Sequence, residues 1–248
     1  MHPALSQIDH RPWEMPRGRW VMRQSWCDLL FAHWPVPKSA LDPLVPASLE
    51  VQQFDGVSWI GVVPFRMQDV GLRAMPNVPG LSAFPELNVR IYVEHQGRAG
   101  VWFLSLDAMN RPAVWTARRF FHLPYYYARM SVRSEGERVV YDSRRVDGDA
   151  PLRFAAGYGP TSSPYQAETG TLEHWLTERY CLYAVDPRGR LHTTEIHHIP
   201  WPLQRAEAEI DVNEMLRPFD LPLADSAPLL HFARRIDVVN WRSRVVGP

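Results

Sequence analysis

The distribution of proline limits what this chain can fold into. Its 23 prolines are spread from one end of the 248 residues to the other. Proline removes a backbone N–H and interrupts the interior of a helix. We therefore predict few long helices and many short segments, among which strands dominate.

Three consecutive segments have the pattern of neighbouring strands. Residues 57–67 are apolar on both faces, which is typical of a buried strand. Residues 86–93 alternate, and residues 100–108 follow after a connection with two glycines. The polar face of the alternating segment consists of Glu86, Asn88, Arg90 and Tyr92, and the apolar face of Leu87, Val89, Ile91 and Val93.

Two short helices interrupt the predicted strands. The first is expected after Asn110, a cap residue, with Pro112 in the first turn and Pro124 at the end. The second covers residues 170–180 and is capped by a threonine, Thr169 or Thr171.

The remaining segments predict more strands. Hairpins are expected around residues 135–136 and 187–189, and further strands near 203–212 and 229–239. Short strands at regular spacing with few helices are typical of an antiparallel barrel or sandwich in one domain.

Composition excludes several classes of protein. The chain is 46% hydrophobic and 22% charged, with zero formal net charge, so it lacks the basic excess of a nucleic-acid binder. The N-terminus has no apolar run like that of a signal peptide, and no stretch approaches the ~18 apolar residues of a membrane span. We predict a cytoplasmic protein whose two cysteines, Cys27 and Cys181, are buried thiols rather than a disulfide.

Several longer motifs resemble a known family. They are "HRPWEMP", "WCDLLFAHWPVP", "FDGVSWIGVVPFRM", "FPELNVRIYV", "GVWFLSLDAMN", "LTERYCLYA" and "IHHIPWPLQ". With them the chain resembles the YqjF-like family of bacterial proteins, whose function is not established, from about residue 10 to 245. That family in turn resembles acetoacetate decarboxylase in fold. The resemblance implies one domain over residues 1–248, of the mainly β (α+β) class, built as a closed, cone-shaped antiparallel β-barrel with a few short helices and an internal pocket.

The same resemblance argues against decarboxylase activity. The decarboxylase forms an imine with its substrate through one of two adjacent lysines, and the resemblance places Tyr125 and Tyr126 at these positions. A phenol cannot form an imine with a ketone. Lys38 is the only lysine of the chain, and no motif matches it to the imine site. Glu86, in contrast, resembles a pocket glutamate of the decarboxylase.

The polar face of residues 86–93 is the first candidate site. Inside a barrel, Glu86 would act as general acid or base with a pKa raised by burial, and Arg90 would bind a carboxylate, with Asn88 and Tyr92 beside them. Periodicity alone instead places this face in solvent, as in many antiparallel sheets. The resemblance favours the cavity.

The run from Tyr125 to Tyr127 is the second candidate. Hydroxyl groups of Tyr125 or Tyr126 would donate hydrogen bonds to a ligand, or the three rings would close one end of the barrel. The middle ring of a strand faces away from its neighbours, so the three cannot all line one site.

The cations that end the first helix, Arg118, Arg119 and His122, would offset its dipole. Arg118 shares an apolar stripe with Val114 and Phe121, so it is the one that we expect to point inward, as an anion anchor in place of Arg90.

No motif indicates a metal or cofactor. Glu195 and His197 share a strand face and would need a remote third ligand to bind zinc, and neither HExxH nor CxxC occurs. We predict no metal and no cofactor.

Three functional hypotheses follow. The first is an enzyme without a Schiff-base lysine that acts on a small oxo or carboxylate compound. Its catalytic residues would be Glu86, Tyr125 and Tyr126, and its substrate-binding residues Arg90, Arg118, Asn88 and Tyr92. The alternatives are a metabolite-binding or sensor protein that uses the same pocket, and a structural protein with a filled barrel. Self-association is left open.

Overall fold

The computed structural model describes residues 2–148, 151–223 and 227–247. Strands make up most of the described chain, and the 13 strands of this part belong to one sheet. The mainly β class predicted from the proline distribution is therefore confirmed. The strands are β1 (Met22–Val36), β2 (Glu50–Val51), β3 (Ser58–Leu72), β4 (Phe84–His95), β5 (Arg98–Ala108), β6 (Tyr125–Glu135), β7 (Arg138–Arg145), β8 (Arg153–Pro160), β9 (Cys181–Val185), β10 (Leu191–His197), β11 (Gln204–Asn213), β12 (Leu229–Asn240) and β13 (Arg244–Val245).

The helices of the described chain are short, and the two that were predicted begin at predicted caps. The side chain of Asn110 accepts a hydrogen bond from the backbone N–H of Ala113 at 3.0 Å. The hydroxyl of Thr171 accepts one from the N–H of His174 at 3.4 Å. The helices are α1 (Lys38–Leu41), α2 (Arg111–Thr116) with a π-helical turn at Ala117–Phe121, α3 (Leu172–Thr177), and 3-10 turns at Pro3–Leu5, Asp42–Leu44 and Arg217–Phe219.

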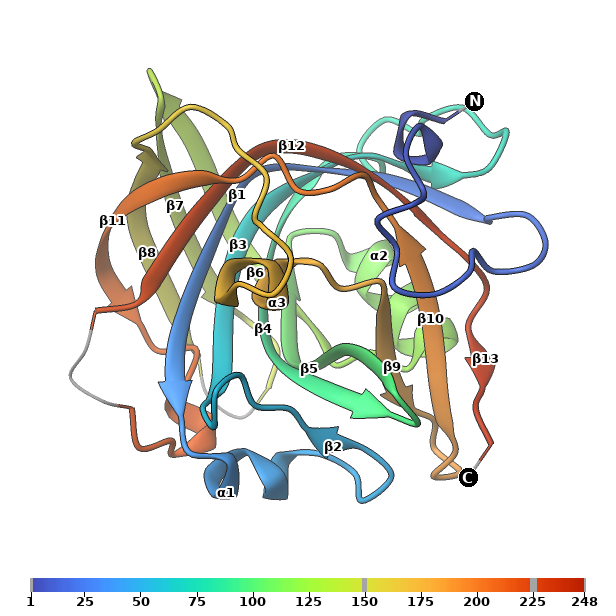
Figure 1. Cartoon of the computed structure of the whole chain (residues 1–248). Coiled ribbons are helices and arrows are strands. Elements are labelled where there is room, and N and C mark those ends of the chain that lie inside the picture. Colours follow the sequence, from blue (N-terminus) through green and yellow to red (C-terminus); the bar gives the residue numbers. More distant parts are fainter. Residues whose placement is uncertain (1, 149–150, 224–226, 248) are drawn as a thin grey trace.

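The sheet closes on itself in two fused rings. Five strands, β12, β1, β3, β4 and β5, are shared by both rings. One ring of nine strands closes through β6, β7, β8 and β11, and one of seven closes through β9 and β10. In Figure 1 the long strands β1, β3 and β12 run together through the middle of the molecule, between the β7–β8 side and the β9–β10 side.

Strand direction departs from the purely antiparallel expectation at β5. β5 pairs in parallel with β6, through Leu106 and Tyr125, and in parallel with β9, through Val101 and Leu182. Parallel pairing needs a crossover connection, and α2 supplies the one between β5 and β6. The remaining pairings are antiparallel, including the predicted hairpins β6–β7 and β9–β10.

β4 belongs to both rings, and this explains why its sequence alternates between apolar and polar residues that are all buried. Its apolar residues Leu87, Val89, Ile91 and Val93 join the large apolar cluster that also contains Tyr141, Phe154, Tyr158 and Phe232. Its polar residues are buried as well, on the opposite face. The interpretation that the polar face of β4 meets solvent is therefore wrong, because a second ring of strands covers it.

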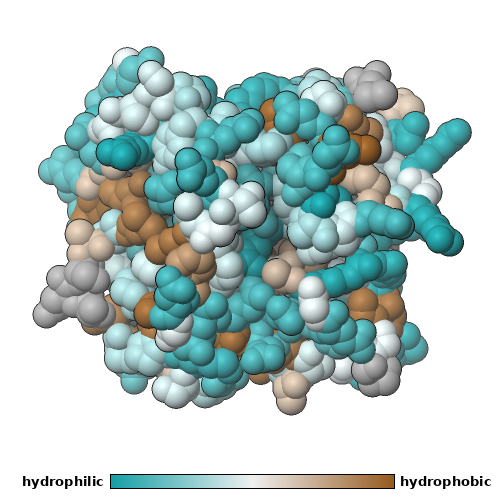
Figure 2. Space-filling model, viewed as in Figure 1, coloured by the Kyte–Doolittle hydropathy of each residue, from teal (hydrophilic) through white to brown (hydrophobic). Residues whose placement is uncertain are grey.

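The two cysteines and the surface also match the predictions from composition. Cys27 and Cys181 are both buried free thiols. No helix of the described residues is long and apolar enough to cross a membrane. Hydrophilic residues cover most of the face shown in Figure 2, where apolar residues form separate groups.

Candidate functional site

The seven-stranded ring encloses a cavity of about 540 Å³. A cavity of this size is typical of sites for small molecules. Its walls come from strands of this ring, from α2, from the end of α3 and from the segment 70–82. Most of the wall is apolar, and the polar side chains inside it include Glu86, Asn88, Arg90, Tyr125, Arg179 and Asn240.

Glu86 is a buried carboxyl group beside a phenol. The hydroxyl of Tyr125 donates a hydrogen bond to Glu86 Oε2 at 2.8 Å. Burial raises the pKa of Glu86 from 4.5 to about 8; the hydrogen bond from Tyr125 acts in the opposite direction, and the charge of Asp107 adds to the rise. The pKa of Tyr125 is raised well above 10 by burial and by the adjacent Glu86. Glu86 can therefore exchange a proton near neutral pH, while Tyr125 remains a neutral donor.

Residues that do not line the cavity also act on Glu86. The hydroxyl of Tyr141 donates a hydrogen bond to the backbone carbonyl of Glu86 at 2.8 Å. Asp107, fully buried, forms an ion pair with Arg145 at 2.6 Å. This pair supplies the negative charge that helps to keep Glu86 protonated.

Two buried arginines line the same cavity and form no ion pair with any described carboxylate. Arg90 Nε donates a hydrogen bond to the Tyr92 hydroxyl at 3.3 Å. Arg179 Nε donates to the carbonyl of Trp175 at 2.7 Å, and its Nη1 donates to Gln52 Oε1 at 2.6 Å. The Nη2 atoms of both arginines are buried without a hydrogen-bond partner in the described chain.

The two guanidinium groups lie close enough to affect each other. Burial, together with the charge of Arg90, lowers the pKa of Arg179 to about 10, against the influence of Tyr92. Arg179 therefore remains protonated at neutral pH, as arginine side chains in proteins do. Removing unpaired charges from water is costly unless another charge compensates them. The arrangement is therefore suited to a carboxylate or another anion.

A second layer of side chains positions Arg90. The hydroxyl of Tyr92 accepts from Arg90 Nε and lies 2.5 Å from His33 Nε2, in a hydrogen bond whose direction is set by the His33 tautomer. Burial holds the pKa of His33 well below its usual value, with smaller contributions from the charge of Arg90 and from His231. A Cβ atom on Gly61 would lie 3.0 Å from the His33 ring, so glycine leaves the space that this arrangement needs.

The structure separates the predicted site residues into three groups. Glu86, Asn88, Arg90 and Tyr125 line the cavity, and Tyr92 lies behind it. Tyr126 does not line it: its ring packs against the guanidinium of Arg145, 4.0 Å from the ring centroid. Tyr125 thus points inward while its neighbour points away, as strand alternation requires.

Arg118 does not point inward as expected. Its side chain is 46% exposed and pairs with Asp147 at 3.6 Å. The π-helical turn at Ala117–Phe121 interrupts the regular helical spacing on which that expectation was based.

Arg179 was missed as a site residue. It follows α3 and reaches the cavity from there. Its place on the apolar stripe of residues 170–180, with Leu172, Trp175 and Leu176, was the available signal. The same signal at Arg118 was misleading, so a place on an apolar helical stripe does not by itself show that an arginine reaches the cavity.

The only lysine lies elsewhere. Lys38 is the first residue of α1, is 32% exposed, and pairs with Asp42 at 2.7 Å. It is not among the residues that line the cavity. No lysine amine of this chain is therefore placed to form an imine there.

Both residues of the metal hypothesis, Glu195 and His197, already have protein partners. Glu195 pairs with Arg11 at 2.6 Å and with Arg244 at 2.6 Å, and accepts a hydrogen bond from Trp13 at 3.0 Å. His197 Nε2 lies 3.0 Å from the carbonyl of Gln7. The carboxylate of Glu195 is therefore neutralised by Arg11 and Arg244. Its contacts with Arg11 and Trp13 hold the N-terminal segment against β10.

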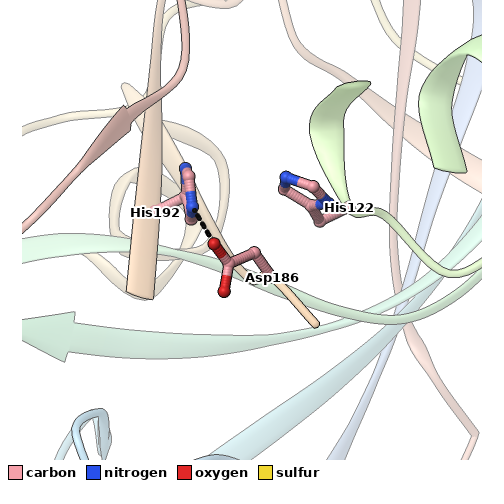
Figure 3. A group of neighbouring side chains, drawn as sticks. All are labelled: His122, Asp186 and His192. Atoms are coloured by element: carbon pink, nitrogen blue, oxygen red, sulfur yellow. Dashed lines mark hydrogen bonds and ion pairs between the residues drawn. The ribbon is translucent and has the colours of Figure 1, made fainter. Parts of the chain in front are cut away.

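A different group has ligand atoms closer together. The histidine–aspartate cluster consists of His122, Asp186 and His192, whose ligand atoms lie within 4.8 Å of one another (Figure 3). Asp186 also pairs with Arg190 at 2.7 Å, and His192 Nε2 lies 3.1 Å from Asp186. Burial alone would raise the pKa of Asp186, but hydrogen bonds from Arg190, His192 and Arg188 together lower it. Arg190 thus already neutralises the carboxylate that would have to bind a metal in this cluster.

Comparison with solved structures defines the class of fold. The acetoacetate decarboxylase from Legionella pneumophila superimposes with a TM-score of 0.64 at 14% identity, covering 95% of this chain and 93% of that one. The enduracididine biosynthesis enzyme MppR, complexed with pyruvate, superimposes with a TM-score of 0.64 at 14% sequence identity, covering 96% of this chain and 93% of that one. At this identity the likeness shows a shared fold, and it confirms the predicted fold relation.

Sequence comparison gives the family. The model of DUF2071, "Uncharacterized conserved protein (COG2071)", matches residues 23–237, and the chain belongs to this family. The uncharacterized protein YqjF of Bacillus subtilis (strain 168) is 48% identical over 230 residues, 93% of this chain and 94% of that protein. The predicted resemblance to YqjF-like proteins is confirmed.

Proposed function

We propose that this protein is an enzyme that binds a carboxylate-bearing oxo compound in the cavity and moves a proton at the carbon next to its carbonyl group. One observation carries the proposal: two buried arginines without carboxylate partners share a cavity with a buried, proton-exchanging carboxyl group. The arginines bind the anion and Glu86 transfers the proton. No Schiff base is involved.

The arginine pair orients the ligand. The unpartnered Nη2 atoms of Arg90 and Arg179 donate hydrogen bonds to the ligand carboxylate. Such charge-assisted bonds to a buried anion also compensate the charges that the empty cavity leaves unpaired. Tyr92 and His33 hold Arg90 in the orientation that this requires.

Glu86 then acts as base and acid in turn. In its carboxylate form it takes a proton from the carbon next to the carbonyl. The electron pair of the broken C–H bond forms the C=C bond of an enolate, and the negative charge moves to the carbonyl oxygen. Asn88, next on the same face of β4, supplies an amide N–H to that oxygen. Protonated Glu86 returns the proton to carbon or oxygen, which completes a tautomerisation.

The pKa of Glu86 suits this role. A general acid–base group works best when its pKa lies near the working pH. With a pKa of about 8, Glu86 populates both forms in neutral and weakly alkaline solution. The hydrogen bond from Tyr125 directs one oxygen of Glu86 and leaves the other for the ligand.

The imine mechanism of a decarboxylase does not suit these residues. The phenol of Tyr125 faces the cavity where the resemblance places a lysine, and Lys38 is bound to Asp42 outside it. The complex of MppR with pyruvate supports an oxo acid as the ligand class within this fold. A cytoplasmic location and self-association stay predictions from the sequence.

The proposal is tested by proton exchange. Oxo carboxylic acids are incubated with the protein in D2O, and deuterium incorporation next to the carbonyl is followed by NMR. We expect the native protein to accelerate exchange, and Glu86→Gln to reduce the rate on the order of 100-fold with little change in affinity. Arg179→Gln should weaken binding roughly 10- to 100-fold. Arg129→Gln, an exposed arginine on β6, is the matched control.

The same experiment identifies the alternative. A ligand that binds through Arg179 but shows no accelerated exchange would indicate a metabolite-binding or sensor protein that uses the same cavity. The filled barrel is disfavoured by the cavity itself. Equal exchange rates in the native protein and in Glu86→Gln would refute the catalytic role of this carboxyl group.

A further inference from the structure

Three polar residues of the cavity, Glu86, Asn88 and Arg90, form a row along β4. Next to this row, β3 supplies only apolar side chains or none: Met67 pairs with Phe84, Phe65 with Glu86, Val63 with Asn88, and Gly61 with Arg90. On the other side, β5 places Ala108 opposite Glu86 and Leu106 opposite Asn88. The polar row therefore runs along the cavity wall between two apolar strands.

The polar row on β4 ends at Arg90, in a closed part of the cavity that also holds Arg179. Arg90 and Arg179 are surrounded by lining residues that are nearly inaccessible. Val101 lies opposite Tyr92 in the sheet and is 5% exposed, and Thr177 and Cys181 are 3% and 2% exposed. An anion bound by the two arginines is therefore shielded from solvent on that side.

The opposite end is open and apolar. Leu72, Met75, Val78 and Leu81 line the cavity and are 41 to 59% exposed. The segment that carries them is held in place: Arg23 donates to the carbonyls of residues 72 and 75, at 2.8 and 2.9 Å, and Asn110 donates to that of residue 80 at 3.0 Å. Large apolar side chains gathered at a cavity opening are typical of a binding surface.

The distance along β4 from the opening to Arg90 sets the size of the ligand. Phe84, which follows the opening segment in sequence, and Arg90 are six positions apart, which corresponds to roughly 20 Å of strand. Glu86 lies between the two, roughly 13 Å of strand from Arg90. An acid as short as acetate or pyruvate that binds the arginines cannot also contact the apolar opening.

We infer that the ligand is an amphipathic carboxylate, with its anionic group on Arg90 and Arg179 and an extended apolar body that runs past Glu86 to the opening formed by Leu72, Met75, Val78 and Leu81. The inference rests on the arginine site of the proposed function and adds the substrate class. It selects acids with a long aliphatic or aromatic tail over short ones. The reacting carbon lies several bonds away from the carboxylate, beside Glu86.

Calorimetric titration with a homologous series tests the inference. The probes are acetate, butyrate, hexanoate, octanoate, decanoate and tetradecanoate, with octanol as the uncharged counterpart of octanoate. We expect the dissociation constant to fall roughly three- to fourfold for each methylene added beyond butyrate. Octanol should bind at least tenfold more weakly than octanoate. A dissociation constant that stays flat or rises beyond butyrate would overturn the inference.

Two variants locate the apolar body. Leu81→Asp, at the opening, should weaken tetradecanoate tenfold or more and leave butyrate unchanged, because only a long chain spans most of the roughly 20 Å between the arginines and the opening. Val146→Asp is the control, because Val146 is 46% exposed but does not line the cavity. Equal affinity of tetradecanoate for Leu81→Asp and the native protein would count against the proposed path.

Failure of this inference can be told apart from failure of the proposed function. If Arg179→Gln weakens all acids equally while chain length has no effect, the arginine site stands and the apolar body is refuted. If long acids bind as well to Arg179→Gln as to the native protein, the anion site is refuted together with the inference.

Discussion

The raised pKa of Glu86 makes the stability of the protein depend on pH in a defined way. In the folded chain the carboxyl group has a pKa of about 8, against 4.5 for an ordinary glutamate. Between these values the folded state keeps a proton that the unfolded chain has released. The free energy of unfolding therefore falls as pH rises, by about 1.4 kcal/mol per pH unit. The contribution is fully present below pH 4.5 and is lost as the pH rises to about 8.

Glu86→Gln removes this dependence. Glutamine resembles the protonated glutamate in shape and still accepts the hydrogen bond from Tyr125. From about pH 5 to pH 7 the native protein should lose about 3 kcal/mol more stability than the variant. For a chain of this size the difference in melting temperature should change by roughly 6 to 12 °C.

The measurement is a series of thermal or urea unfolding curves across this pH range. Other groups titrate in the native protein as well, including His33, so the difference between native and variant is the informative quantity. Glu207→Gln, an exposed glutamate on β11, serves as control and should follow the native curve. If Glu86→Gln loses stability in parallel with the native protein, the carboxyl group is not protonated in the folded state and the reasoning fails.

Three further predictions concern the surroundings of the site. Asp107→Asn leaves Arg145 buried without its partner, and denaturant unfolding should show a loss of about 3 to 5 kcal/mol. Gly61→Ala forces a Cβ atom against His33, and we expect a loss of about 1 to 3 kcal/mol together with weaker binding of carboxylates in titrations. Chelation with EDTA should leave the melting temperature unchanged, and added zinc should not raise it, since Arg190 already neutralises the histidine–aspartate cluster; a zinc-dependent rise that His192→Ala abolishes would contradict this.

Much of the strand pattern was predictable because local rules determine it. The alternation in residues 86–93, the turns near residues 136 and 189, and the caps at Asn110 and Thr171 depend on neighbours in sequence. These features appear in the structure as predicted. Alternation shows that two faces differ, and this information is local.

What each face meets is not local information. β4 borders two rings because β5 pairs both with β6 and with β9, and these pairings join residues far apart in sequence. Periodicity alone placed Glu86 and Arg90 in solvent, and only the family resemblance placed them in a cavity. The parallel pairings of β5 had no signal in the chain read by itself.

Arg118 and Arg179 show the same limit in side chains. Both lie on apolar stripes of predicted helices, so sequence treats them alike. A π-helical turn and the nearby Asp147 keep Arg118 at the surface. Arg179 instead follows α3 into the ring, where Trp175 and Gln52 hold it.

The arginine pair also relates stability to binding. Gln52 lies between Arg179 and Glu94, since it accepts from the arginine and donates to the glutamate at 2.9 Å, and Arg179 forms no ion pair with a carboxylate of the described residues. Hydrophobic residues at these positions would avoid the cost of burying two charges. A fold that keeps Arg90 and Arg179 unpaired is therefore less stable when empty than it need be, and an anion that pairs with them recovers the difference. Saturation with a ligand at a hundred times its dissociation constant should add about 2.7 kcal/mol to the free energy of unfolding. At the same ligand concentration the gain should fall to about 0.4 to 1.4 kcal/mol in Arg179→Gln, because that variant binds the ligand roughly 10- to 100-fold more weakly.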